Sequence, residues 1–144
     1  MTTVGDVALI LRNGKSVRQS PDAKGLPITR IETIADGTIN PSKVGYANLE
    51  EEDCTDWLME SGDILISHIN STKHLGKCAI YRGNPQLLVH GMNLLALRVD
   101  RDLASPNYVY RVLSSPDFRK QIPRITKDSV NQSSFNISNF KKLN

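Results

Sequence analysis

Several short motifs in the chain contain residue types that take part in catalysis, but none completes a known pattern. A two-metal nuclease needs clustered carboxylates, and Pro21-Asp22 and Pro116-Asp117 lack the further acid and lysine of such a cluster. Gly83-Asn84-Pro85-Gln86 lacks the second proline and the aromatic ring of a DNA methyltransferase motif, and no glycine-rich cofactor loop accompanies it. Leu75-Gly76-Lys77-Cys78 lacks the first glycine of a P-loop.

Metal or nucleophilic chemistry is the remaining possibility. His68, His74 and Cys78 carry metal-binding side chains, but their spacing matches no common zinc pattern. No serine or cysteine nucleophile can be paired with a general base from the sequence alone. We therefore expect a non-enzyme that uses no metal and no cofactor.

A segment without acidic residues is the strongest binding signal. The 36 residues between Asp63 and Asp100 contain no carboxylate, and they include Lys73, Lys77, Arg82, Arg98 and all three histidines. The segment begins with an apolar strand, Gly62–Ser67, which leads into a polar loop, His68–His74. A donor-rich, acid-free loop at the end of a buried strand suits contact with an anionic polymer. The alternative is an ordinary solvated loop between two strands.

Charge is divided unevenly along the chain. The net charge is only +3, but residues 1–72 carry 6 basic and 11 acidic side chains, whereas residues 73–144 carry 12 basic and 4 acidic ones. The acids concentrate at Glu50, Glu51, Glu52, Asp53, Asp56, Glu60 and Asp63. One basic and one acidic face would suit a nucleic-acid binder, although split charge also occurs in proteins that bind nothing anionic.

The order of elements predicts an α+β fold with a twisted, mostly antiparallel sheet and short helices. Residues 4–11 are expected to form a short helix, residues 28–34 a β-rich segment, and Asp36-Gly37 a hairpin turn. Strands are expected at 64–66, 77–82, 87–89 and 93–99; in 93–99, Leu95, Leu97 and Val99 share one face and Arg98 lies on the other.

Helices are expected in the last third. Ser105-Pro106 and Ser115-Pro116 each combine an N-cap residue with a proline at the first helical position. Pro123 is expected to end the second helix, and residues 124–134 to form a polar loop. Phe135–Ile137 should return to the core, and Ser138 could cap a final helix.

Size and composition fit one ordinary folded domain. The chain has 144 residues, of which 39% are hydrophobic. Two cysteines are too few for a disulfide framework, and no apolar stretch approaches the roughly 20 residues of a membrane span. We see no signal peptide, so we expect a cytoplasmic protein with no membrane partner.

The motifs, in their order and spacing, resemble a target recognition domain from the specificity subunit of type I restriction–modification enzymes. The resemblance covers nearly the whole chain and is carried by Gly25–Ile28, Arg30-Ile31, Asp36–Ile39, Gly62–Ser67, Asn70-Ser71, Gly76-Lys77, Asn93–Arg98, Pro106–Tyr110 with Leu113, Phe118-Arg119, and Val130–Gln132 followed by Asn136–Ser138.

The resemblance implies a fold of the DNA target-recognition-domain type over residues 1–138, with residues 139–144 as the start of a truncated spacer helix. In that family each recognition domain reads one half of a bipartite target in double-stranded DNA without catalysis. Partner subunits carry out modification by methyl transfer and restriction by cleavage. A full specificity subunit has two such domains and two long helices, whereas this chain shows only one domain. An alternative function is a non-catalytic protein-interaction or decoy module that docks on restriction–modification subunits.

The family does not fix which side chains contact DNA, so we infer them from their chemistry. Asn and Gln can bond adenine, Arg and Lys can bond guanine, and Lys, Arg, Ser and Thr contact phosphate. The candidates fall into three groups: Asn70, Ser71, Thr72, Lys73, His74 and Lys77 in the acid-free loop; Arg30, Arg12, Lys15 and Arg18 near the first loop; and Lys127, Asn131 and Gln132. Asn131 and Gln132 could instead bond to backbone in the turn before Phe135.

Overall fold

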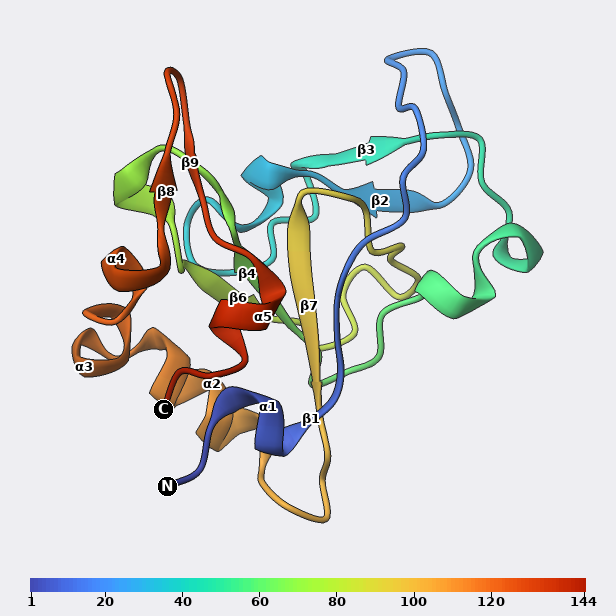
Figure 1. Cartoon of the computed structure of the whole chain (residues 1–144). Helices are drawn as coiled ribbons and strands as arrows, with labels where there is room; N and C mark the ends of the chain where they lie inside the picture. Colours follow the sequence, from blue (N-terminus) through green and yellow to red (C-terminus); the bar gives the residue numbers. More distant parts are fainter.

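A four-stranded antiparallel sheet lies at the centre of the computed structural model, which describes residues 1–144 (Figure 1). The strand order is β1-β7-β4-β6, and the bounds are Ala8–Asn13 for β1, Leu94–Val99 for β7, Ile64–Ser67 for β4 and Cys78–Ile80 for β6. In this sheet Leu65 of β4 lies opposite Ala79 on one side and Ala96 on the other. The expected α+β class with a mostly antiparallel sheet is confirmed.

The inner strands β4 and β7 carry apolar side chains toward both faces of the sheet. Leu95 and Leu97 of β7 join one core cluster, together with residues from the helices, whereas Leu65 of β4 belongs to a second cluster on the opposite face. The alternation predicted for 93–99 is therefore confirmed. Because both faces are covered, these strands form the most buried part of the protein.

Short helices cover the first face of the sheet. They are α1 (Val4–Val7), α2 (Pro106–Ser114), α3 (Pro116–Arg119), α4 (Ile122–Ile125) and α5 (Ile137–Phe140). They bury Val109, Leu113, Phe118, Ile122 and Phe140 against the sheet. None of the helices has the length and apolar character needed to cross a membrane.

Two of the predicted helix starts are confirmed by their capping bonds. The Ser105 hydroxyl accepts from the Tyr108 backbone N–H at 3.4 Å, and the Ser115 hydroxyl accepts from that of Phe118 at 3.2 Å. Pro123 was wrongly expected to end a helix: it lies in the first turn of α4, where its missing N–H has no helical partner to lose.

On the second face, short segments close over the sheet. They comprise β2 (Pro27–Thr29), β3 (Val44–Tyr46) and the 3₁₀ helices η1 (Ile31–Ile34), η2 (Glu51–Asp53) and η3 (Thr55–Trp57). Strands β2 and β3 pair antiparallel, and Ile28 of β2 also forms a bridge with Val89. The expected strand at 87–89 is thus reduced to bridges made by Val89, the second of them with Leu58.

A third, small sheet projects beyond the core. It contains β5 (Ile69–Asn70), β9 (Ser133–Ser134) and β8 (Lys127–Asp128), in the order β5-β9-β8, and the 3₁₀ helix η4 (Thr72–His74) follows β5. The expectation of an unstructured polar loop over 124–134 is therefore wrong, since these residues include the end of α4 and a β-hairpin. The hairpin is formed by the local pairing of β8 with β9, and β9 also pairs with β5, a contact with a residue far away in the sequence that a local pattern does not reveal.

The N-terminal half contains two further corrections. The predicted helix over 4–11 ends at Val7, because Ala8–Asn13 is drawn into the sheet as β1, with Leu11 opposite Leu97. The β-rich segment 28–34 is a strand only to Thr29 and then turns into η1, since the Thr33 hydroxyl accepts from the Arg30 N–H at 2.9 Å. Asp36-Gly37 does form a turn, but no hairpin strand follows it.

The C-terminal residues pack on the domain. Asn136, and not Ser138, caps α5, because its side-chain oxygen accepts from the Asn139 N–H at 2.8 Å. Phe140 and Leu143 are buried in the helical core, and the Val4 N–H donates to the Leu143 carbonyl at 2.9 Å. That residues 139–144 begin a spacer helix stays a prediction.

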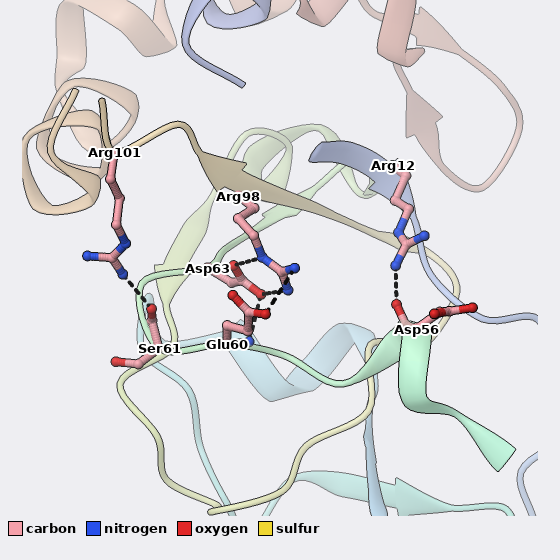
Figure 2. A network of polar contacts seen from close by, with 7 residues as sticks. All are labelled: Arg12, Asp56, Glu60, Ser61, Asp63, Arg98 and Arg101. Carbon is pink, nitrogen blue, oxygen red and sulfur yellow. Dashed lines mark hydrogen bonds and ion pairs between the residues drawn. The ribbon is translucent and has the colours of Figure 1, made fainter. Parts of the chain in front are cut away.

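Arginines fasten the acidic segment onto the central sheet (Figure 2). Arg98 of β7 grips the Asp63 carboxylate with two bonds of 2.9 Å and approaches Glu60 at 3.4 Å. Asp63 also accepts from the Glu60 N–H at 2.8 Å. On either side of this pair, Arg12 donates to the Asp56 carbonyl and Arg101 to the Ser61 carbonyl. Four contacts from three strongly basic side chains thus hold residues 56–63 in place.

The Asp63→Ala substitution tests this fastening. It removes a buried carboxylate and leaves the half-buried Arg98 guanidinium without its main partner, so we expect a loss of about 3 kcal/mol of unfolding free energy. The Glu60→Ala substitution is a matched control, because the Glu60 side chain is 68% exposed; its loss should stay below about 1 kcal/mol. Urea unfolding of both variants measures the difference, and equal losses would show that the buried pair has no special role.

Two buried histidines make the fold sensitive to acid. His68 is 7% and His90 is 3% exposed. Burial lowers the pKa of each imidazole from 6.5 to about 4. Mutual repulsion with His90 on protonation lowers the pKa of His68 further, whereas the bond to Leu94 opposes the lowering of the His90 pKa. His90 Nε2 contacts the Leu94 carbonyl at 2.6 Å, which fixes its proton on that nitrogen.

Stability should therefore fall between pH 6.5 and pH 4. In this window the unfolded chain binds protons at the histidines and the folded chain does not, so protonation favours unfolding. By pH 5 each histidine should remove up to about 2 kcal/mol of stability. The His90→Gln variant retains an N–H donor and should lose part of this dependence. Urea unfolding at pH 7.5 and pH 5 checks it; the same pH dependence in both proteins would contradict the assignment.

Candidate nucleic-acid interface

The structure brings the first and third groups of candidate residues together. Asn70 of β5 pairs with Ser133 of β9, so the acid-free loop and the hairpin share one small sheet. A chain of hydroxyl contacts reinforces the join: Thr72 Oγ1 lies 3.0 Å from Ser133 Oγ, and Ser133 Oγ donates to Asp128 Oδ1 at 2.6 Å. In Figure 1 this sheet lies at the top of the view and both termini lie at the bottom.

The side chains of the acid-free loop differ in whether they already form hydrogen bonds within the protein. Asn70 is half-buried; its Oδ1 accepts from the Ser71 N–H at 2.7 Å and its Nδ2 lies 3.4 Å from Ser67 Oγ. Ser71, Thr72 and Lys73 are exposed. Lys73 makes no hydrogen bond or ion pair, so its ammonium group is free to bind an anion.

Lys77 and His74 form a pair directed into the protein. Lys77 Nζ donates to the Ala35 carbonyl at 2.7 Å and to His74 Nδ1 at 3.0 Å. An ammonium group has no acceptor, so His74 Nδ1 must be the unprotonated nitrogen. Partial desolvation lowers the His74 pKa, and the charges of Lys77, Lys73 and Arg119 lower it further. The cations that depress this pKa make the surface around His74 electropositive.

The hairpin candidates are exposed and unpaired. Lys127, Asn131 and Gln132 are exposed, and none of the three side chains makes a hydrogen bond within the protein. The alternative that Asn131 and Gln132 serve to bond the local backbone is therefore not what the structure shows. Their amide groups remain available to a ligand.

The second group of candidates is spread out. Arg30 is exposed, pairs with Glu32 at 3.0 Å and lines a hollow of about 610 Å³ between the loop after β1 and strands β2 and β3. Arg18 is exposed and Lys15 half-buried, neither with a polar side-chain partner. Arg12 lies apart: its guanidinium stacks on Trp57, 4.1 Å from the ring centroid, and serves the network of Figure 2.

A cleft borders the first group and adjoins, at Ile31 and Glu32, the hollow that Arg30 of the second group lines. It has a volume of about 230 Å³ and lies between η1 and the acid-free loop, with Asn70, His74 and Lys77 on one wall and Ile31 and Glu32 on the other. The hairpin pairs with β5 just before η4, and the cleft and the hollow join this region to η1 and to the β2–β3 pair, so these segments together form the candidate surface.

Sequence reasoning missed basic residues beside the hairpin. Arg124 of α4 is exposed and unpaired, and Arg119 of α3 donates to the Leu75 carbonyl at 2.9 Å, next to the acid-free loop. A hollow of about 280 Å³ lies between η4, α3 and β8 and is lined by Thr72, Arg119 and Asp128. The density of basic residues from 119 to 127 was the available signal. His68, His74 and Cys78 do not assemble into a metal-binding cluster.

Comparison with known proteins places this geometry in context. No family model matches the chain. Over 139 residues, 96% of its length, the chain is 44% identical to the Methanocaldococcus jannaschii protein assigned as the specificity subunit of the type I restriction enzyme MjaX, of which it spans 33%. Over 124 residues, 85% of its length, it is 27% identical to the specificity subunit of the type I restriction enzyme EcoKI from Escherichia coli K12, of which it spans 26%.

A solved structure shows the same fold. The crystal structure of the S subunit of a type I restriction–modification system from M. genitalium superposes with a TM-score of 0.63 at 13% identity, covering 99% of this chain and 32% of that one. The fold is therefore that of a type I specificity subunit. The chain is a homologue of such subunits and spans about a third of the relatives that it matches. The two relatives are named as specificity subunits of type I restriction enzymes; that this chain is not an enzyme stays a prediction.

Proposed function

We propose that this chain binds duplex DNA in a sequence-specific manner, without catalysis, and reads one half of a bipartite restriction–modification target. The observation that carries the proposal is the 44% identity to an assigned specificity subunit over 96% of the chain. Residues 1–138 would form the recognition domain and residues 139–144 the start of a spacer helix. Modification and restriction subunits would supply methyl transfer and cleavage, and a DNA target would place the chain in the cytoplasm.

Charge on the candidate surface supports contact with phosphates. Lys73, Arg124 and Lys127 are exposed, lack partners within the protein and lie on adjoining elements. Two nearby acids have partners within the protein, since Glu32 pairs with Arg30 and Asp128 accepts from Ser133. Unpaired basic side chains release counterions when they bind phosphates, which gives affinity and a strong dependence on salt.

Base reading needs planar groups that are free in the unbound protein. An amide that can donate and accept edge-on matches the major-groove edge of adenine. Asn131 and Gln132 have such free amides at the hairpin tip, whereas the amide of Asn70 is engaged with Ser71 and Ser67. Among the candidates, the hairpin pair therefore fits base reading better, and Asn70 fits the role of shaping its own turn.

The first expected outcome concerns salt. The chain alone should bind non-specific duplex DNA with a dissociation constant in the range of about 10⁻⁴–10⁻⁶ M at physiological salt. The Lys73→Ala substitution should weaken binding to all sequences about equally and reduce the slope of log affinity against log salt by roughly one. The Lys142→Ala substitution, at the end of the molecule with the termini, is the matched control and should change neither quantity.

Fluorescence anisotropy at several salt concentrations measures both values. Tight binding that ignores salt would contradict the electrostatic account. No DNA binding at any salt would favour the alternative, a protein-interaction or decoy module that docks on restriction–modification subunits.

The second expected outcome concerns sequence. After selection of a preferred duplex from a random pool, Asn131→Ala or Gln132→Ala should cost about 1–3 kcal/mol on that duplex and little on a scrambled one. Asn70→Ala should instead lower thermal stability slightly, because it removes a turn-forming bond. If Asn70→Ala abolished discrimination and the hairpin variants did not, base reading would belong to the acid-free loop.

A further inference from the structure

An apolar side chain stands at the tip of the hairpin without any contact. Val130 is 98% exposed, more than any other large apolar residue except the N-terminal Met1. β-branched residues are uncommon in tight turns, where Gly, Asn, Asp, Ser and Pro prevail. Because the Val130 side chain is fully exposed, it gains no free energy from burial and does not stabilise the fold.

The tip presents Val130 outward. The Ser129 N–H and the Ser129 hydroxyl both donate to the Gln132 carbonyl, at 2.8 Å and 2.7 Å. These bonds close the loop around Val130 and Asn131, which become its two central residues. Figure 1 shows the hairpin rising away from the rest of the protein, so both residues stand at its far end.

The base of the hairpin is held firmly. Ser133 pairs with Asn70 in β5 and also bridges Thr72 and Asp128 through its hydroxyl. The Asp128 side chain is thereby engaged, and the residue lines the hollow that it shares with Arg119. The tip itself, residues 129–132, contains no acid and would enter a negatively charged groove without repulsion from its own residues.

We propose that the hairpin tip enters the major groove and that Val130 reads thymine through contact with its C5 methyl group. The proposal rests on the DNA-binding function proposed above. A two-stranded β-ribbon fits the major groove of B-form DNA, and the thymine methyl is the only apolar group among the standard base edges there. A free valine beside free amides matches a thymine beside a hydrogen-bonding base, so the tip reads the target by shape and by polarity together.

Replacing thymine by uracil in the selected duplex tests the proposal, because it removes the methyl group alone. At the contacted position the wild-type chain should lose about fourfold in affinity, the value of one buried methyl group. The Val130→Ser variant should bind the thymine and uracil duplexes equally. Its fold should be unaffected, since Val130 touches nothing, and a thermal melt identical to wild type confirms this.

The Leu103→Ser substitution is the matched control. Leu103 is 63% exposed and belongs to the turn after β7, which lies at the bottom of Figure 1, away from the hairpin, so this variant should keep the full sensitivity to uracil. If uracil at every thymine position leaves wild-type affinity unchanged, if Val130→Ser keeps the same loss, or if the selected site contains no thymine, the assignment of Val130 is overturned while DNA binding stands. If no sequence is selected at all, the proposed function fails with it.

Discussion

Strand β4 is the constraint on which the rest of the molecule depends. It pairs with β6 and β7 and is buried on both faces, so neither end of it can shift without disturbing two core clusters. At its start Asp63 is clamped by Arg98, and at its end Ser67 releases the chain into the acid-free loop. The start of that polar loop is therefore held in position by a strand of the core.

The same arginine contacts explain how a chain of modest net charge can carry a basic surface. Arg98 pairs with the carboxylates of Asp63 and Glu60, whereas Arg12 and Arg101 donate to backbone carbonyls of the same segment (Figure 2). On the candidate surface, Lys73, Arg124 and Lys127 have no such partners, although Arg30, Lys77 and Arg119 do. The arginines that contact residues 56–63 are thus engaged within the protein, whereas the unpaired basic residues of the candidate surface stay free for an anionic ligand.

Patterns confined to a few neighbouring residues predicted structure well, and patterns that depend on distant partners did not. The buried strand at 64–66 and the capped starts at Ser105 and Ser115 are local, so the sequence revealed them. Strand β1 is paired with β7, and the hairpin, whose strands β8 and β9 pair with each other, is attached to the distant strand β5. For the site, the sequence identified hydrogen-bond donors but not whether they are already bonded within the protein. Lys77 and Arg12 were predicted to contact DNA, but in the fold they donate to the carbonyls of Ala35 and Asp56.

A polar side chain that is already hydrogen-bonded within the protein has a structural role, whereas one without such a bond is available to a ligand. A buried or bonded amide has already offset its loss of water within the protein, so it gains little from DNA, whereas a free one gains a partner on binding. In this chain the engaged side chains, such as Asn70, Thr72 and Ser133, form the base of the hairpin, and the free ones stand at its tip. Because the tip contacts nothing in the core, its residues can change without loss of stability. A fixed base beneath a replaceable tip would allow one fold to read many different DNA sequences.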